Sequence, residues 1–574
     1  MHDLVIRNAR IVDGSGAPEF HGDIAVDGDR ISIVGDVPDE GRREIDAAGR
    51  LVTPGWVDIH THYDGQVTWD PEVSPSGWHG VTTIVMGNCG VGFAPADPAR
   101  RQWLIQLMEG VEDIPGTALE EGMSWNWETF PEYLDEVEAM PRVLDVAALV
   151  PHGAVRAYVM GDNAAVHDQA TPEQIDEMTE IVRVALEAGA IGFSTTRTLL
   201  HRAKDGELAA GTNADAVELI GIGRALGQAH AGVFSVASDM FDPHSEIAWM
   251  TEVSRESGRP VTFACLQSPF DADNWRTLID LADGAAANGA HIVPQVAGRP
   301  ACVMLGFESS ANPFMFHQGY LAVAELPLAE RVQQLRKPEV RRAILDEVVE
   351  LRGLQAIVMQ SFARLFPLGD PPEYEPAPDA SVAAIADREG RPAPEVAYDL
   401  MLEQDGRALL YFPLIGYAAG DFDALEEMLL HPTTVLGLGD GGAHCGVLCD
   451  AGLPTFMLTH WVRDRSRGSR LTLEAAVHHQ TRRTAALYGF DDRGLLAPGY
   501  LADINVIDFD ALTVPAPEMV YDLPAGGRRL IQRATGYVAT IKSGVVVRQD
   551  DEATGERPGV LIRGHQAAPA SVPA

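Results

Sequence analysis

Lysine is scarce in this chain of 574 residues, which contains only Lys204, Lys337 and Lys542. Arginine supplies the rest of the 43 basic residues, which face 83 acidic ones and leave a formal net charge of -40. A surface this acidic repels the phosphates of nucleic acids and the headgroups of anionic lipids. The composition therefore argues against nucleic acid and membrane partners, and we expect a small-molecule partner instead.

Cysteine and long hydrophobic runs are also scarce. The five cysteines form an odd set, too small for a disulfide framework in a chain of this length. No run approaches the roughly 20 apolar residues of a membrane helix, and the first residues lack the apolar core of a signal peptide. We therefore expect reduced thiols and a cytoplasmic location.

Length and patterning divide the chain into β-rich ends and a long centre. Segments 1–53 and 491–565 carry short alternating runs separated by Asp/Gly turns, which predicts one discontinuous β-sandwich closed by both termini. Residues 566–574 are rich in Ala, Pro and Ser, and we expect a disordered tail there. Hydrophobic residues make up 46% of the chain, enough for a large core in the centre.

The centre, 54–490, alternates eight short apolar runs with helical patterns. These runs lie near residues 55–59, 82–86, 145–150, 190–194, 232–236, 260–264, 291–295 and 434–438. Eight β/α alternations predict an α/β fold of the (β/α)8 TIM-barrel type. The seventh and eighth runs are far apart, which indicates an insertion at about 299–432 that can cover the active site.

Chemistry in such a barrel sits where the strands end. His60 and His62 follow the first run, Cys89 the second, His152 the third and Asp440 the eighth. Two histidines at a spacing of two on extended chain project to the same side and can share one divalent metal. An aspartate beside them can bind that metal and take a proton from water.

Each of these residues also has a purely structural interpretation. A His-x-His pair is common, Cys89 can be a small buried residue, and His152 can satisfy a backbone carbonyl. Asp440 lies in a glycine-rich turn, where aspartate often shapes the turn itself. The metal interpretation rests on the coincidence that His60, His62, Cys89 and Asp440 all fall at strand ends on one face.

Several motifs resemble the amidohydrolase superfamily, and within it the N-acyl-D-amino-acid deacylase (D-aminoacylase) branch. They are Pro-Gly-Trp-Val-Asp-Ile-His-Thr-His at 54–62, Gly-Asn-Cys-Gly at 87–90, Trp-Asn-Trp at 125–127, Gly-Phe-Ser-Thr at 192–195 and Pro-Gly-Tyr-Leu-Ala-Asp at 498–503. The resemblance implies that Cys89 is a metal ligand, that His60 and His62 belong to a second metal position, and that Asp440 is the general base. It also implies one or two divalent ions, with zinc expected, and a homo-oligomer.

The branch has two further metal-binding histidines, one after the fifth run and one after the sixth. This chain has a different residue at each of these places. Ala237 replaces one, and Cys265 stands near the other and can still offer a thiolate. Gln267 occupies the place of a lysine that contacts the substrate carboxylate. We therefore expect one metal held by His60, His62 and Asp440, assisted by Cys89 and by Cys265 or His444.

Because the lysine is replaced, other side chains near the strand ends are the candidates for contact with the substrate. Arg197 and Arg299 are the cations near strand ends, and His444 and Gln267 are the polar candidates. Either arginine can equally form an ordinary salt bridge.

The predicted function is hydrolysis of a C–N bond, as in an N-acyl amino acid or similar small amide, by metal-activated water. Asp440 serves as the base, and His152 stabilises the intermediate. Two alternatives stay open: a cyclic amide or imide hydrolase of the same superfamily, and a relative that has lost catalysis and serves as a binding or assembly protein.

Overall fold

Two parallel sheets lie at the centre of the computed structural model, which describes residues 1–570. The first has the order β6-β7-β8 and the second the order β17-β13-β12-β11-β10-β9, so neighbours in space follow the chain. Their bounds are β6 (Trp56–Asp58), β7 (Val81–Met86), β8 (Asp145–Ala148), β9 (Val150–Pro151), β10 (Gly192–Arg197), β11 (Val233–Ser238), β12 (Val261–Ala264), β13 (Ile292–Ala297) and β17 (Val435–Gly437). Each overlaps a run that the sequence predicts as a strand.

The edges of the two sheets meet on both sides. Leu149 alone separates β8 from β9, so these are two pieces of one run. On the other side, the backbone N–H of Asp440 donates to the carbonyl of His60 at 2.9 Å, and that of His62 donates to Gly441 at 2.8 Å. The first and last strands of the centre are therefore joined just beyond their ends, and we name these two hydrogen bonds the seam.

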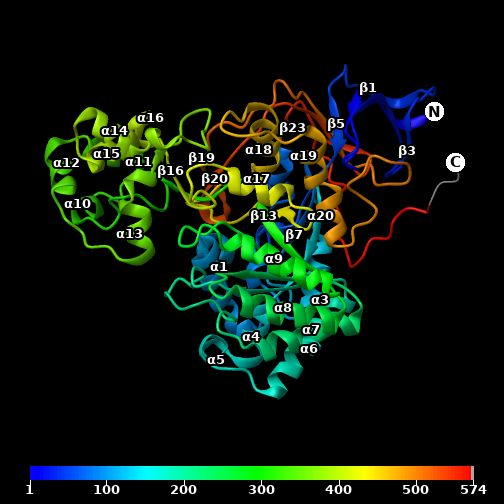
Figure 1. Ribbon diagram of the computed structural model, residues 1–574, viewed down its shortest axis with the longest axis horizontal. Helices are drawn as coiled ribbons and strands as arrows, with labels where there is room; N and C mark the ends of the chain where they lie inside the picture. The colour runs from blue at the N-terminus through cyan, green and yellow to red at the C-terminus, as the bar shows by residue number, and fades with distance from the viewer. Residues whose placement is uncertain (571–574) are drawn as a thin grey trace.

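Helices cover the outside of the parallel strands (Figure 1). The sequence predicts α6 well, because Thr171 caps its first turn, Gln174 completes the capping box, and Pro172 stands at the first helical position. The helices are α1 (Arg101–Glu112), α2 (Gly116–Gly122), α3 (Phe130–Ala139), α4 (His152–Met160), α5 (Asp162–His167), α6 (Pro172–Glu187), α7 (Ala216–Ala229), α8 (Pro243–Ser257), α9 (Asn274–Ala287), α17 (Asp423–Leu430), α18 (Leu453–Phe456), α19 (Leu473–Gln480) and α20 (Arg482–Leu487). No helix of the described chain is both long and apolar enough to cross a membrane.

Both chain ends build one nine-stranded sheet, at the upper right of Figure 1. The N-terminal strands join the C-terminal ones through antiparallel β5 and β18, with Val52 opposite Val506. The strands are β1 (His2–Ile11), β2 (Phe20–Asp27), β3 (Arg30–Gly35), β4 (Gly41–Asp46), β5 (Leu51–Pro54), β18 (Ile504–Ile507), β21 (Tyr537–Lys542), β22 (Val545–Gln549) and β23 (Glu552–Ala553). Of the predicted tail 566–574, Gln566 pairs with Phe490, and 571–574 lie outside the described residues.

The segment between β13 and β17 forms a lobe of its own, at the left of Figure 1. Its antiparallel sheet, β14-β16-β15, carries helices that bury a separate hydrophobic core around Phe307, Phe314 and Tyr398. The elements are β14 (Ala301–Leu305), β15 (Phe366–Pro367), β16 (Leu410–Ile415), α10 (Gln318–Leu321), α11 (Leu328–Leu335), α12 (Pro338–Leu345), α13 (Gly353–Gln360), α14 (Val382–Glu389), α15 (Ala393–Met401) and α16 (Glu403–Gly406). The lobe's sheet spans residues 301–415, within the range of the predicted insertion, while α17 in the same range packs against β13.

A buried cluster of charges ties the terminal sheet to the parallel strands. Lys542 of β21 lies 3.0 Å from the Asp145 carboxylate on β8 and 2.9 Å from Asp503. Arg493 contacts the same Asp145 oxygen at 2.6 Å, and all four side chains are almost fully buried. One of the three lysines therefore sits at the junction of two parts of the fold.

We expect Asp145→Asn to destabilise the protein by about 3–5 kcal/mol, because it leaves two buried cations short of a partner. Urea unfolding measures this directly. The matched control is Asp135→Asn at an exposed pair with Arg563, which should cost less than about 1 kcal/mol. Equal effects of the two substitutions would contradict the role assigned to the buried cluster.

Candidate active site

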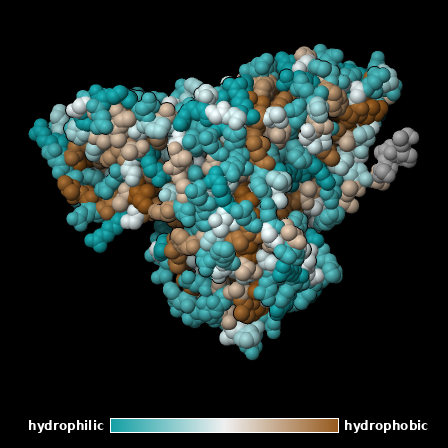
Figure 2. Space-filling view, viewed as in Figure 1, coloured by the Kyte–Doolittle hydropathy of each residue, from teal (hydrophilic) through white to brown (hydrophobic). Residues whose placement is uncertain are grey.

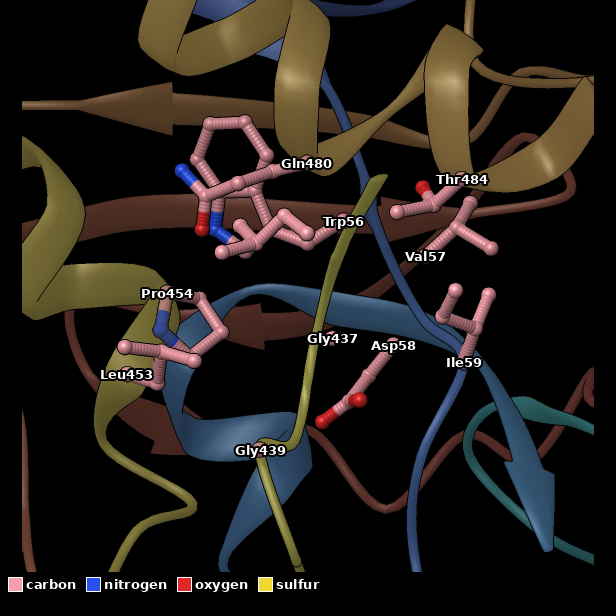
Figure 3. A pocket seen from close by; sticks show the side chains of 11 residues that line it. Trp56, Val57, Asp58, Ile59, Gly437, Gly439, Leu453, Pro454, Gln480 and Thr484 are labelled. Carbon is pink, nitrogen blue, oxygen red and sulfur yellow. The ribbon is translucent and has the colours of Figure 1, made fainter. Parts of the chain in front are cut away.

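His60 and His62 lie directly beyond the end of β6, and Asp58 fixes the chain there. The Asp58 carboxylate accepts the backbone N–H of His60 at 3.1 Å, and burial raises the pKa of Asp58 to about 7. Figure 3 shows Asp58 beside Gly439 in a small cavity under the site. A Cβ at residue 439 would lie 2.5 Å from Asp58 Oδ2, so only glycine lets the eighth strand approach this closely.

Cys89 approaches these histidines from the end of β7. Its backbone has a φ of 56°, a left-handed conformation that turns the side chain toward the site, and its Sγ lies 3.4 Å from Nε2 of His60. The flanking Gly87 is required because a Cβ there would lie 2.3 Å from the carbonyl oxygen of Leu149. The Gly-Asn-Cys-Gly motif thus packs a thiol against an imidazole.

Asp440 completes the group from the far side of the seam. Its Oδ1 lies 3.3 Å from Nε2 of His60 and 3.4 Å from Nε2 of His62. Its φ of 42° is a strained conformation for a residue with a side chain, held by the backbone hydrogen bond to His60. Four residues from three strand ends therefore converge on one point.

The donor atoms fit a divalent metal. One ligand atom each from His60, His62 and Cys89 lies within 4.8 Å of the others, and all three side chains are buried. Burial opposes charge on His60, yet Cys89 and Asp440 raise the pKa of that imidazole to about 9. In return, the imidazoles lower the pKa of the Cys89 thiol and that of Asp440. The imidazoles share protons with the Cys89 thiol and the Asp440 carboxylate, and a bound divalent cation would replace these protons.

Glu112, at the end of α1, is a member of the site that the sequence analysis missed. Its side chain is fully buried, with one oxygen 3.3 Å from Nδ1 of His62 and the other 3.3 Å from Nε2 of His444. A carboxylate on the outer nitrogen of a metal-binding histidine fixes the tautomer and orients the ring. Helical spacing does place Glu112 on the same buried face as Leu104 and Met108, and that was the available signal.

Gln295 of β13 holds the other histidine by a hydrogen bond. Its Oε1 lies 2.7 Å from Nδ1 of His60, which leaves Nε2 of that ring facing Cys89 and Asp440. The outer nitrogen of His60 is thus hydrogen-bonded, that of His62 faces Glu112 at ion-pair distance, and both inner nitrogens face Asp440.

A cavity of about 400 Å³ opens above this point. His60, His62, Cys89, Asp440 and His444 line its floor. Its walls come from the loops after β10, β11 and β12 and from β14, β16 and α13 of the insertion. The volume is that of a small-molecule site, and the insertion supplies one wall of it.

The other two predicted metal or catalytic residues lie apart from this cluster. His152 is fully buried, with Nδ1 2.8 Å from the Thr195 hydroxyl and Nε2 2.7 Å from Glu218. Both of its ring nitrogens are occupied, and it does not line the cavity, so the geometry assigns it a packing role. Cys265 lies outside the metal cluster, and burial raises the pKa of its thiol to about 12, which disfavours the thiolate that a metal needs.

Among the predicted substrate contacts, only His444 lines the cavity. Arg197 pairs with Glu246 at 3.0 Å, so the salt-bridge interpretation holds for it. Gln267 accepts the N–H of Ala418 with its side chain and is buried away from the cavity. Arg299 lies in a smaller side cavity, 2.6 Å from Asp450, and its charge is already balanced.

Substitution of Cys89 and of Cys265 distinguishes a cysteine that binds metal from one that only packs in the core. We expect Cys89→Ala to lower the zinc bound per folded chain several-fold, because it removes a ligand atom, and Cys265→Ala to leave it unchanged. Elemental analysis of dialysed protein, with circular dichroism to confirm folding, measures both. Loss of metal from Cys265→Ala, or its retention by Cys89→Ala, would show that the ligand set is different.

Glu112→Gln tests the orientation of His62. We expect about 10- to 100-fold weaker zinc binding, because an amide cannot stabilise the imidazole as a carboxylate does. Competition with a chelator gives the dissociation constant without any assay of activity. An unchanged constant would mean that Glu112 is merely a buried acid.

The comparisons with known proteins identify the family. The model of the amidohydrolase family matches residues 43–548. D-aminoacylase of Alcaligenes xylosoxydans xylosoxydans is 27% identical over 98% of this chain and 97% of its own, and N-acyl-D-aspartate deacylase of the same organism is 28% identical over 99% and 96%. A solved D-aminoacylase with a binuclear metal centre superposes with a TM-score of 0.65 at 24% identity, covering 98% of this chain and all of that one, which shows a shared fold. The chain therefore belongs to the amidohydrolase family, in its D-aminoacylase branch, and is a hydrolase of carbon–nitrogen bonds other than peptide bonds.

Proposed function

We propose that the protein hydrolyses a small N-acyl compound at its amide bond and uses one zinc ion held by His60, His62 and Cys89. The observation that carries this proposal is the Asp440 carboxylate, which lies within 3.4 Å of both imidazoles and lines the same cavity. Metal-dependent amide hydrolysis is the chemistry of the family; the acyl compound, the identity of the ion and the number of ions are the parts we propose.

The eight parallel strands, taken together, support this use of the site. We infer that the two parallel sheets act as one barrel spanning 54–490, closed by the seam and by the continuity of β8 with β9. Strand ends of a barrel share one face, which explains how residues as distant in sequence as Cys89 and Asp440 come to serve one reaction.

A bound divalent ion would supply Lewis acidity, which acidifies water and polarises the amide carbonyl. Asp440 then accepts a proton from the attacking water and transfers it to the leaving nitrogen. Its backbone is held by the seam, so the carboxylate stays between the two histidines while it exchanges the proton. Gln295 and Glu112 keep the two imidazoles oriented throughout.

The ligand set supports one ion rather than two. Ala237, which lines the cavity at the end of β11, has no ligand atom, and Cys265 lies outside the cluster. The two positions that would complete a second ligand set after β11 and β12 are therefore not supplied. This supports a single ion at the His60, His62 and Cys89 position.

Asp440→Asn should retain its zinc and lose at least about 100-fold in kcat, because an amide cannot accept the proton. The assay measures amine released from a panel of N-acyl compounds, per zinc bound. The matched control, His152→Gln, should lower the unfolding temperature but keep the kcat of the folded protein within about three-fold. Wild-type activity in Asp440→Asn would overturn the proposed mechanism.

A further inference from the structure

No arginine or lysine lines the active-site cavity within residues 1–570. The ionisable side chains that do line it are four histidines, Cys89, Cys302 and the carboxylates of Asp239 and Asp440. Glu112 adds a fully buried carboxylate beside His62. Apart from the metal and the histidines at its floor, the cavity offers a substrate carboxylate no counter-ion to offset its lost hydration.

The nearest cations are already committed to other partners. Arg197 is held by Glu246 and by the carbonyl of Ala214, and Lys204 pairs with Glu109 outside the cavity. Arg299 lines the adjoining side cavity of about 50 Å³, where it pairs with the buried Asp450 at 2.6 Å. Its remaining buried N–H group suits a neutral acceptor such as a carbonyl better than a second carboxylate.

The entrance of the cavity is apolar. Leu199 and Leu200 after β10, Phe241 after β11, Phe270 after β12 and Leu354 of α13 all line the cavity. Phe241 and Phe270 are 75% and 72% exposed. Five of the fourteen large hydrophobic side chains that are exposed in the described chain therefore gather at one opening. Figure 2 shows hydrophobic surface on the part of the insertion lobe that carries α13.

Large exposed apolar side chains around a pocket mark a surface that a ligand covers. They come from three separate loops and from the insertion, so no single local turn accounts for their exposure. Met240, Leu266, Leu278 and Leu414 also line the cavity, and of these Met240 and Leu278 are buried. Most of the lining above the metal ligands is thus apolar.

We propose that the substrate is an uncharged, lipophilic amide: an N-acyl compound with an extended apolar chain and no carboxylate beside the nitrogen. This rests on the proposed function and narrows its substrate class. Hydrolysis breaks the C–N bond, the oxygen of water joins the acyl carbon, and a water proton goes to the leaving amine. The apolar entrance binds the chain, and the absence of a cation excludes N-acyl amino acids that carry a free carboxylate.

The direct test compares two compounds that differ only in this charge, N-octanoyl-D-leucine and N-octanoyl-D-leucinamide. With zinc-loaded enzyme, octanoate release should give a kcat/KM at least ten-fold higher for the leucinamide. Equal values, or a preference for the free acid, would overturn the inference.

A binding measurement separates this inference from the proposed function. Calorimetric titration of zinc-loaded Asp440→Asn should give a dissociation constant at least ten-fold lower for the leucinamide than for the acid. Failure of the wild type to cleave either compound would count against the proposed function. The ratio of the two dissociation constants would still test the substrate class. Equal affinity, or binding of neither compound, contradicts the inference.

The entrance has its own test. The double variant Phe241→Ser/Phe270→Ser should raise KM at least five-fold for an N-octanoyl substrate and less than two-fold for its N-acetyl counterpart, with kcat unchanged. The control is Phe20→Ser, an exposed phenylalanine on the terminal sheet, which should change neither KM. An equal rise for both chain lengths, or no rise for either, would show that the entrance does not bind the chain.

Discussion

The seam between the first and last parallel strands is the constraint on which the site depends. Two backbone hydrogen bonds, from Asp440 to His60 and from His62 to Gly441, hold together segments that lie almost 400 residues apart in the chain. Without them the Asp440 carboxylate has no fixed position between the two imidazoles. The seam in turn requires Gly439, because the Asp58 carboxylate occupies the space that any larger residue would need. The proposed metal binding and general-base catalysis thus depend on the same few residues as the packing of these strands.

Charge is distributed unevenly around that seam. The molecule carries a large negative charge, yet its few buried cations are used for structure: Lys542 and Arg493 join the terminal sheet to the parallel strands, and Arg299 is matched by Asp450. None of them lines the active-site cavity, whose charged groups gather around the metal ligands and whose other walls are mostly apolar. This distribution is the basis of the proposal that the site prefers neutral substrates, and the insertion supplies part of the apolar wall.

The sequence alone predicts the central strands, the lobe at 299–432 and the convergence of His60, His62, Cys89 and Asp440, because strand ends of parallel sheets share one face. The sequence cannot tell a functional residue from a structural one when the side chain that contacts it is remote in the chain. His152 and Arg197 look functional until Glu218 and Glu246 are found beside them. Glu112 shows the reverse error: a helix rather than a strand end carries it, and only tertiary packing brings it to His62. Cys265 follows its strand as expected, but its thiol lies in an apolar environment away from the cluster.

Zinc K-edge X-ray absorption of the loaded protein tests the central claim most directly, since it reports the atoms around the ion without any assay of activity. The account predicts one sulfur ligand at about 2.3 Å, from Cys89, together with imidazole nitrogens from two histidines at about 2.0–2.1 Å. It also predicts that the sulfur is absent in Cys89→Ala. A shell of nitrogen and oxygen alone in the wild type would contradict the account, because the ion would then lie away from the point where the three strand ends meet.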